Sequence, residues 1–255
     1  MEATVLRNPW IPITPSYKQS LFLAYEGIEA LYGGAAGGGK SAAVLAAALQ
    51  YFSVPGYSAL ILRKTYADLA QSGALMDRAN DWLRPTPARW NSQEHRWTSP
   101  EGGSLQFGYL ETANDHFRYQ GAEYQSITLD EVGQIPEHQY LYMFSRLRRL
   151  QDFPVPLRMR CTANPGSEWV KQRFVSQSYL AADEDTKFAR VWEKSGRLFV
   201  PARLQDNPAL NIAEYRQSLA KLDSVTRAQL EHGDWTAHSG GRFKAAWWRR
   251  FRDDG

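Results

Sequence analysis

Residues 34–41 are Gly34-Ala35-Ala36-Gly37-Gly38-Gly39-Lys40-Ser41. This stretch matches the phosphate-loop pattern GxxxxGK[ST], and its surroundings have the order that the pattern requires. The apolar residues 28–32 before it predict a buried strand, and the alanine-rich residues 41–49 after it predict a helix. A strand, a glycine loop and a helix N-terminus together form a cradle whose backbone N–H groups face phosphate oxygens. The sequence therefore predicts an α/β fold with a phosphate site at residues 34–41.

Two side chains of this loop have predicted roles beside the phosphates. Lys40 would reach the β- and γ-phosphates of a nucleoside triphosphate, and the Ser41 hydroxyl would bind Mg²⁺. Ordinary glycine-rich turns also match short patterns by chance, so the assignment needs support from a second motif.

The second motif is a short β-prone segment that ends in two carboxylates, Ser126-Ile127-Thr128-Leu129-Asp130-Glu131. It has the Walker B form, and in open α/β folds ligands bind at the carboxyl ends of parallel strands. Asp130 would hold Mg²⁺ through its water shell, and Glu131 would orient and deprotonate the attacking water. The alternative is a carboxylate pair that only ends a strand at the surface. Together the two motifs predict nucleotide hydrolysis.

The bulk composition is that of an ordinary globular protein with one large domain, or with a domain and an appendage. The chain has 255 residues, of which 43% are hydrophobic, and a formal net charge of +3. The chain shows no apolar run near the roughly eighteen residues of a membrane span, and its start is not that of a secretion signal. We therefore expect a cytoplasmic protein without membrane contact. The single cysteine, Cys161, lies in an apolar run and predicts a buried small residue.

Strands and helices alternate along the chain. Helices are predicted over residues 16–25, 41–49, 65–83, 136–150, 167–177, 212–221 and 224–231, and further strands over 58–63, 126–131, 157–162, 188–192 and 197–200. Between Arg89 and Tyr109, short alternating runs and a Gly102-Gly103 turn predict a small antiparallel insertion. The alternation predicts a mainly parallel, twisted sheet with helices on both faces, which is the architecture of P-loop NTPases.

Further motifs narrow the class of NTPase. They are Pro15-Ser16-Tyr17-Lys18-Gln19, Arg63-Lys64-Thr65, Cys161-Thr162-Ala163-Asn164-Pro165, Asp206-Asn207-Pro208-Ala209-Leu210 and, after a helix, Gly233-Asp234-Trp235. With the two nucleotide motifs, they resemble the ATPase domain of the large terminase subunit of tailed double-stranded DNA bacteriophages. The resemblance runs from about Pro15 to Trp235, and it implies an ASCE-type P-loop ATPase domain over residues 1–235. By this resemblance, residues 206–210, the helix after them and residues 233–235 would close the domain without touching ATP.

The resemblance also implies roles for four side chains outside the nucleotide motifs. The segment at Pro15 resembles the adenine-recognition segment, in which the Gln19 amide would pair with adenine and Tyr17 would stack on the ring. Residues 161–165 resemble the coupling motif, in which Thr162 and Asn164 would sense the γ-phosphate or the attacking water. An ordinary Asn-Pro-Gly turn is the alternative for the second segment.

The chain departs from the family pattern early in the phosphate loop. Many large terminases have an arginine or lysine where this chain has Ala35 and Ala36, so a further cation must come from elsewhere. An arginine finger from a neighbouring subunit contributes about 10³ to 10⁵ in rate in other P-loop enzymes. The resemblance favours Arg118 for this role. Arg146 and Arg148 are the other candidates, and a surface salt bridge is the alternative for each.

A second departure concerns the end of the chain. A large terminase normally continues into a nuclease domain of the RNase H type, whereas this chain ends at Gly255 after the linker-like residues 236–255. No carboxylate cluster beyond Asp130 and Glu131 is visible in the sequence. We therefore expect the motor half alone, without cleavage of DNA.

The resemblance implies a motor that uses ATP and Mg²⁺ to push viral DNA into a procapsid. Such a motor forms a homo-oligomeric ring in the host cytoplasm, docked on the procapsid portal. Its implied partners are double-stranded DNA, held by its backbone, the portal protein and the small terminase subunit. Two alternatives are a helicase or recombination-type P-loop ATPase and a docking module that binds nucleotide without turnover. A helicase is disfavoured because the sequence shows no second motor domain. A docking module is disfavoured because the nucleotide motifs are intact.

Overall fold

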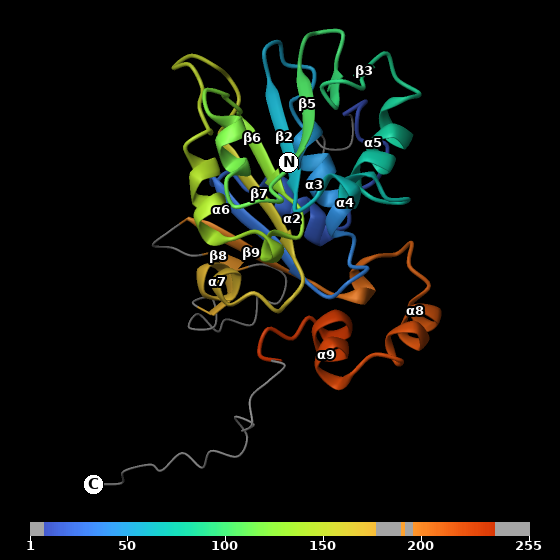
Figure 1. Ribbon diagram of the computed structural model, residues 1–255. Coiled ribbons are helices and arrows are strands. Elements are labelled where there is room, and N and C mark those ends of the chain that lie inside the picture. The colour runs from blue at the N-terminus through green and yellow to red at the C-terminus, as the bar shows by residue number, and fades with distance from the viewer. Residues whose placement is uncertain (1–7, 177–189, 192–195, 238–255) are drawn as a thin grey trace, which may run out of the picture.

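The computed structural model describes residues 8–176, 190–191 and 196–237 (Figure 1). Within these residues a nine-stranded sheet has the order β3-β4-β5-β2-β6-β7-β1-β9-β8. The strands are β1 (Glu29–Gly34), β2 (Ser58–Arg63), β3 (Arg89–Asn91), β4 (Arg96–Thr98), β5 (Ser104–Tyr109), β6 (Ser126–Leu129), β7 (Arg158–Ala163), β8 (Arg190–Val191) and β9 (Arg197–Ala202). The six strands from β5 to β9 in this order are parallel, and β3, β4 and β8 add antiparallel pairs at the two edges. The predicted mainly parallel sheet is confirmed.

Helices cover both faces of the sheet (Figure 1). They are α2 (Tyr17–Ala24), α3 (Lys40–Leu49), α4 (Tyr66–Ala70), α5 (Leu75–Leu83), α6 (Glu137–Phe144), α7 (Glu168–Val170), α8 (Ile212–Leu219) and α9 (Ser224–His232). One hydrophobic core joins α2, α3 and α5 to one face, and a second core joins α6 and the segment after β7 to the other. This is the three-layer arrangement that the sequence predicts.

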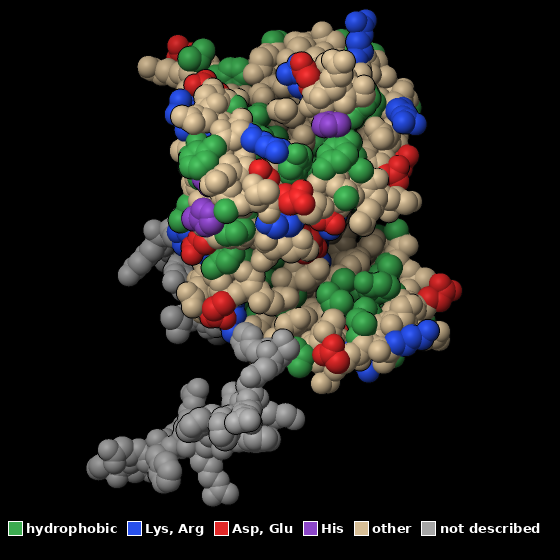
Figure 2. Space-filling model, in the orientation of Figure 1, with side chains coloured by type: hydrophobic (Ala, Val, Ile, Leu, Met, Phe, Trp, Pro, Cys, Tyr) green, Lys and Arg blue, Asp and Glu red, His purple; other side chains and the backbone are tan. Residues whose placement is uncertain are grey.

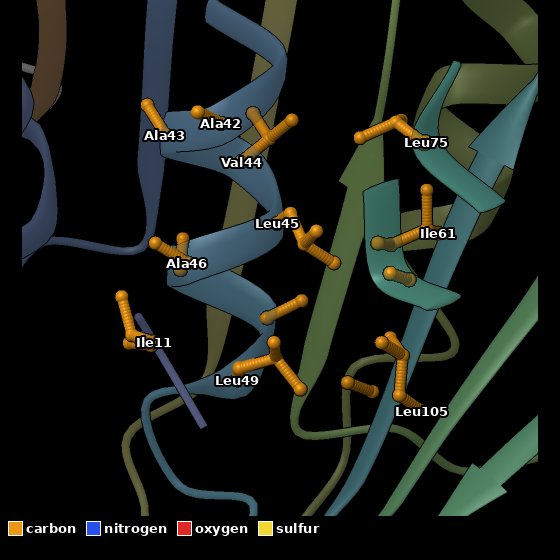
Figure 3. Close-up of a cluster of buried hydrophobic side chains, with 14 of the residues drawn as sticks. Ile11, Ala42, Ala43, Val44, Leu45, Ala46, Leu49, Ile61, Leu75 and Leu105 are labelled. Carbon is orange, nitrogen blue, oxygen red and sulfur yellow. The ribbon is translucent and has the colours of Figure 1, made fainter. Parts of the chain in front are cut away.

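Helix α3, which follows the glycine loop, is buried on all sides. Its residues from Ala42 to Leu49 are all buried. Alanine gives this helix high intrinsic propensity, and its small side chain lets α3 lie close to the sheet and to its neighbouring helices. Figure 3 shows Leu45 and Leu49 of α3 directed toward Ile61 of β2 and Leu105 of β5. The packing of α3 fixes the position of the loop in front of it.

Strand β7 lies between the phosphate-loop strand β1 and the carboxylate strand β6. In the register, Gly33 is opposite Ala163 and Leu129 is opposite Cys161. Because all three strands are parallel, their carboxyl ends meet at one edge of the sheet. An added strand between the two motif-bearing strands is the ASCE-type arrangement that the sequence analysis predicts.

Two predicted helices have the wrong extent. The helix predicted over 65–83 is divided into α4 and α5, because the chain turns at Gly73, whose φ of +74° breaks the helical path. Its predicted cap is confirmed, since Thr65 Oγ1 accepts a hydrogen bond from the Asp68 N–H at 3.1 Å. The helix predicted over 136–150 ends at Phe144. Beyond it, the backbone of Arg146 and Arg148 pairs with Tyr124, just before β6.

The segment between Arg89 and Tyr109 differs in one respect from a separate antiparallel insertion. Strands β4 and β5 form the predicted antiparallel pair, Gly102 makes the predicted turn between them with a φ of +93°, and β3 adds a further antiparallel strand. Strand β5, however, pairs with β2 in parallel and so belongs to the main sheet. The predicted strand at 188–192 is present as β8, but its ends lie outside the described residues, as do residues 238–255 of the predicted linker. None of the described helices combines the length and apolar character that crossing a bilayer requires.

Candidate functional site

The glycine loop between β1 and α3 follows a path that side chains would block. Gly34 has a φ of +135°, and a Cβ there would lie 2.5 Å from the Ala202 carbonyl oxygen of β9. Gly39 has a φ of +79°, and its Cβ would lie 2.9 Å from Gln19 Nε2. Both positions therefore require glycine, and the loop lies tightly against β9 on one side and α2 on the other.

A cavity of about 740 Å³ lies over this loop. Its lining residues are Ile13, Thr14, Pro15, Ser16, Gln19, Ala36, Gly37, Gly39, Lys40, Ser41, Ala42, Arg78, Glu131, Asn164, Asp206, Asn207, Pro208 and Ala209. They come from the N-terminal arm, the loop, α5, the ends of β6 and β7, and the segment after β9. The volume falls within the roughly 300–1,000 Å³ that is usual for ligand pockets. The fold thus gathers distant motifs around one space at the carboxyl edge of the sheet.

Lys40 is held at the floor of this cavity. Its Nζ donates hydrogen bonds to the Ala35 carbonyl oxygen at 2.7 Å and to Asn164 Oδ1 at 2.8 Å. Burial lowers the pKa of Lys40, while Glu131 and Asp130 act in the opposite direction. The ammonium group is therefore poorly solvated and placed where an anionic ligand would improve its surroundings.

Glu131 has an unusual backbone and a firmly held side chain. Its φ of +52° is in the left-handed region, which costs a non-glycine residue about 1–3 kcal/mol. Asn164 Nδ2 donates to both carboxylate oxygens, at 3.1 and 3.2 Å, and so holds the carboxylate beside the end of β7. Burial raises the pKa of Glu131, with Lys40 opposing the shift. Strain, orientation and a raised pKa together suit a general base.

Asp130 and Thr162 form a second, fully buried pair. Thr162 Oγ1 donates to Asp130 Oδ1 at 2.6 Å and accepts a hydrogen bond from the Glu131 N–H at 2.9 Å. Arg63 Nε lies 3.6 Å from the other oxygen of Asp130. Thr162 and Asn164 at the end of β7 thus each hold one of the two carboxylates at the end of β6. The proximity of Arg63 was not predicted, although its place at the end of β2 could have suggested it.

The residues predicted to hold Mg²⁺ have suitable chemistry. Ser41 lines the cavity, and Asp130 is only 3% exposed at the neighbouring strand end. Hydroxyl and carboxylate oxygens are hard ligands of the kind that Mg²⁺ prefers. Within the described part of the chain, no group of three or more His, Cys, Asp or Glu side chains could hold a metal. The donor set therefore fits an ion that is also bound by nucleotide phosphates.

The adenine-recognition segment divides into two parts in the structure. Gln19 lines the cavity, but its Oε1 accepts a hydrogen bond from the Ser16 N–H at 2.8 Å and its Nε2 donates to the Gly39 carbonyl oxygen at 2.9 Å. Its amide therefore joins α2 to the glycine loop. The Tyr17 side chain is 65% exposed and is not among the residues that line this cavity. Ile13, Thr14 and Pro15, which were not predicted, line it instead.

The three candidate arginine fingers lie outside the cavity of their own chain. Arg118 is in the short 3-10 helix η1 (Asp115–Tyr119) after β5, with its Nε 3.5 Å from Asp115 Oδ1 and its guanidinium 4.5 Å from the centre of the Tyr109 ring. Arg146 and Arg148 lie at the opposite side of the sheet, where the parallel strands begin. Their backbone pairs with Tyr124, which precedes β6. Of the three arginines, only Arg118 lies on the side where the parallel strands end and where the glycine loop is found.

Two sets of cavity residues were not assigned to the site from the sequence. The segment of residues 206–209 lines the cavity, and Asn207 Nδ2 donates to the Gly37 carbonyl oxygen of the loop at 2.8 Å. The expectation that this segment closes the domain without touching the nucleotide site is therefore wrong. Arg78 of α5 also lines the cavity, and no motif surrounds it in the sequence.

Comparison with protein families matches residues 31–250 to the family described as terminase large subunit, T4likevirus-type, N-terminal. The fold resembles the large terminase of a thermophilic bacteriophage, with a TM-score of 0.66 at 14% identity over 88% of this chain and 54% of that one. It also resembles the large terminase ATPase domain of Thermus phage P74-26, with a TM-score of 0.60 at 16% identity over 89% of this chain and 96% of that one. The N-terminal domain of the DNA packaging ATPase of bacteriophage phi29 gives a TM-score of 0.53 at 17% identity over 74% of this chain and 97% of that one.

The chain spans about half the length of the thermophilic bacteriophage terminase that it resembles. The search of curated proteins gives no match. At these identities the solved structures show a shared fold, whereas the family match covers well over half of the chain. The glycine loop, the strand order and the paired carboxylates agree with that match. The chain therefore belongs to the terminase large subunit family and corresponds to the N-terminal part of that family's proteins.

Proposed function

We propose that this chain hydrolyses ATP with Mg²⁺ to move double-stranded DNA into a viral procapsid. The observation that carries the proposal is the hydrogen-bonded series Lys40–Asn164–Glu131 at the floor of the nucleotide-sized cavity. These three hydrogen-bonded side chains are the ones to which we assign the roles of phosphate-binding cation, polar sensor and general base. The thermophilic bacteriophage terminase of the same fold is known in complex with ATP-γ-S, which supports ATP as the ligand.

The side chains divide the chemical work among themselves. Backbone N–H groups of residues 34–39 and the Lys40 ammonium would bind the phosphates, and Ser41 and Asp130 would hold Mg²⁺, which neutralises phosphate charge when bound. Glu131 would orient the attacking water and take its proton. Gln19 would keep the loop in place through its hydrogen bond to Gly39. Its amide still has a second N–H and a second lone pair on its oxygen, and these would make any direct contact with adenine. Tyr17 would reach an adenine ring only after moving from its exposed position.

Asn164 is placed to report the state of the nucleotide. Its Oδ1 accepts from Lys40 and its Nδ2 donates to Glu131. If a phosphate oxygen accepts the hydrogen bond that Lys40 now donates to Asn164, Asn164 loses this partner. Its side chain can then turn toward the γ-phosphate or the attacking water. Thr162 keeps Asp130 in place during this exchange. The end of β7 would thereby couple the phosphate to the rest of the domain, as the sequence analysis expects.

We propose a homo-oligomeric ring in which Arg118 completes the site of a neighbouring subunit. Arg118 is half-exposed and follows the carboxyl end of β5, at the edge of the sheet that carries the glycine loop. Arg146 and Arg148 lie at the other edge, which disfavours them. A viral genome packaging motor assembly of bacteriophage phi29 has the same fold, with a TM-score of 0.54. The portal protein, the small terminase subunit and a place at the procapsid portal in the host cytoplasm belong to the same proposal.

DNA would be held by its backbone without regard to sequence, so its affinity would fall steeply with salt. On the face shown in Figure 2, Lys and Arg side chains are spread among Asp and Glu side chains, and this face does not by itself single out a DNA-binding surface. Residues 1–235 would form the motor domain and residues 236–255 a linker. We propose no nuclease activity for this chain.

Replacement of Glu131 by Gln tests the proposal. The amide keeps the size of the side chain and one acceptor oxygen but removes the base, so ATP turnover should fall by about 10²-fold or more. Binding of MgATP, measured by isothermal titration calorimetry, should persist. If the wild-type protein binds ATP and shows no turnover at any protein concentration, with or without DNA, the chain is a docking module and the proposal is wrong.

A further inference from the structure

We infer that Arg78 is a second phosphate-binding cation of the nucleotide site, supplied by α5 of the same chain. The inference rests on the proposed function, because it adds a residue to the same site. Arg78 lines the cavity together with Lys40 and Ser41. It lies 38 positions beyond Lys40 in a helix without a recognisable motif, so only the fold brings the two side chains to one cavity.

The position of Arg78 on α5 explains how it reaches the cavity. Leu75, Ala79 and Trp82 of α5 are buried, and α5 packs against α3. Residues three and four apart share a face of a helix, so Arg78 lies on the same side as Leu75 and Trp82. The side chain therefore extends along α3 toward the first turn of that helix, where Ser41 and Ala42 also line the cavity.

Arg78 has an unmet need for an acceptor. In the described part of the chain, four arginines have a buried Nε without a hydrogen-bond acceptor, namely Arg63, Arg78, Arg158 and Arg160. The other three donate to a carbonyl oxygen through another guanidinium nitrogen. For Arg78 the described residues supply neither such a bond nor a carboxylate within 4.0 Å. A guanidinium that is partly withdrawn from water and aimed into a cavity is stabilised by an anionic ligand.

The charge balance of the cavity points to the polyphosphate as that ligand. Its charged lining residues are Lys40, Arg78, Glu131 and Asp206. Asp206 is paired with Lys18 at 2.6 Å, and Lys40 is linked to Glu131 through Asn164. Ala35 and Ala36 give the loop no cation of its own beyond Lys40. Among the charged side chains that line the cavity, Arg78 is therefore the cation that is available for the triphosphate. The start of α3, where phosphate groups are expected to bind, lies next to it.

The experiment compares Arg78→Gln with Arg84→Gln as a matched control. Arg84 lies at the end of the same helix, is exposed and does not line the cavity, so its replacement changes the charge equally. Calorimetric titrations with MgATP, MgADP and AMP give the affinities, and circular dichroism melting verifies the fold. We expect Arg78→Gln to weaken MgATP binding by about 10- to 100-fold and AMP binding much less, because a lost charge-assisted hydrogen bond has this size. Arg78→Lys should recover part of the loss, and Arg84→Gln should bind as the wild type does.

The outcomes separate this inference from the proposed function. If the wild type hydrolyses ATP and Arg78→Gln binds and hydrolyses it equally well, the inference is wrong and the proposed function stands. An equal loss for AMP and MgATP would assign Arg78 to the nucleoside or to the α-phosphate, which AMP also carries, and would overturn its assignment to the polyphosphate. If the wild-type protein binds none of the three nucleotides, the proposed function fails and the inference fails with it.

Discussion

Replacing Thr162 by Val should destabilise the protein strongly, although the two side chains have nearly the same shape. Thr162 is fully buried, and its hydroxyl donates to Asp130 at 2.6 Å and accepts from the Glu131 N–H at 2.9 Å. Valine leaves a buried carboxylate oxygen and a backbone N–H without a partner. A hydrogen bond to a charged group contributes about 1.5–3 kcal/mol and a neutral one about 1 kcal/mol, so the loss should be about 2.5–4 kcal/mol.

Thr128 provides the control, because it is equally buried on the neighbouring strand β6 and its hydroxyl has no partner among the described residues. Thr128→Val should leave the stability unchanged or raise it, since it removes a buried polar group that forms no hydrogen bond. Urea unfolding followed by tryptophan fluorescence gives the free energy of unfolding of the wild type and both variants. Thr162→Ser should retain most of the stability. If Thr162→Val and Thr128→Val cost the same, the buried pair with Asp130 does not have the role that its geometry indicates.

The loop, the base and the ring each give a further prediction. Gly34→Ala should abolish nucleotide binding and lower the stability several times more than Gly73→Ala. The Cβ of the first variant would lie 2.5 Å from the Ala202 carbonyl oxygen, whereas a Cβ at position 73 has no atom within 4 Å. Equal melting temperatures of the two variants would contradict this. Burial raises the pKa of Glu131 above its ordinary value of 4.5. The folded state therefore keeps a proton that the unfolded chain releases, and the contribution of Glu131 to stability should fall as pH rises from about 4.5 to the raised pKa. In urea unfolding at several pH values, Glu131→Gln should remove this fall, and an unchanged pH profile would refute it. Arg118→Ala should lower ATP turnover per molecule in assembled protein by about 10³-fold or more, while Arg148→Ala does not; ATPase assays over a range of protein concentrations test this, and full turnover by Arg118→Ala would exclude it as the finger.

The local elements of the nucleotide site follow closely from the sequence. Strand β2 has the predicted bounds. Strand β6 begins as predicted but ends at Leu129, two residues before the predicted end, and β7 begins and ends one residue later than predicted. Helix α2 is capped by Ser16, which starts the predicted helix. These features depend on patterns of neighbouring residues, such as apolar runs, capping side chains and glycines that must adopt positive φ, and such patterns are visible in the sequence. For the same reason the glycine loop and the paired carboxylates could be located before the fold was known.

The ends of some elements depend on contacts that are distant in the sequence. Helix α6 stops at Phe144 because the chain beyond it pairs with Tyr124, and β5 is drawn into the main sheet by its parallel pairing with β2. Local propensity favours continuing the helix. It also favours the hairpin of β4 and β5, which does form, but it does not identify β2 as the further partner of β5. The competing backbone hydrogen bonds come from residues that the local pattern does not include, and tertiary pairing overrides propensity.

The sequence by itself determined the fold class, the phosphate loop with Lys40 and the carboxylates Asp130 and Glu131, because each is specified by adjacent residues. Only the tertiary structure decided that Asn164 joins Lys40 to Glu131, that Tyr17 is exposed and does not line the cavity, and that residues 206–209 and Arg78 line it. Periodicity shows that a helix such as α5 has a buried face, but it does not show which segment covers that face or what lies at its border. Those relations arise when segments far apart in the sequence pack together, since packing brings their side chains to a common cavity.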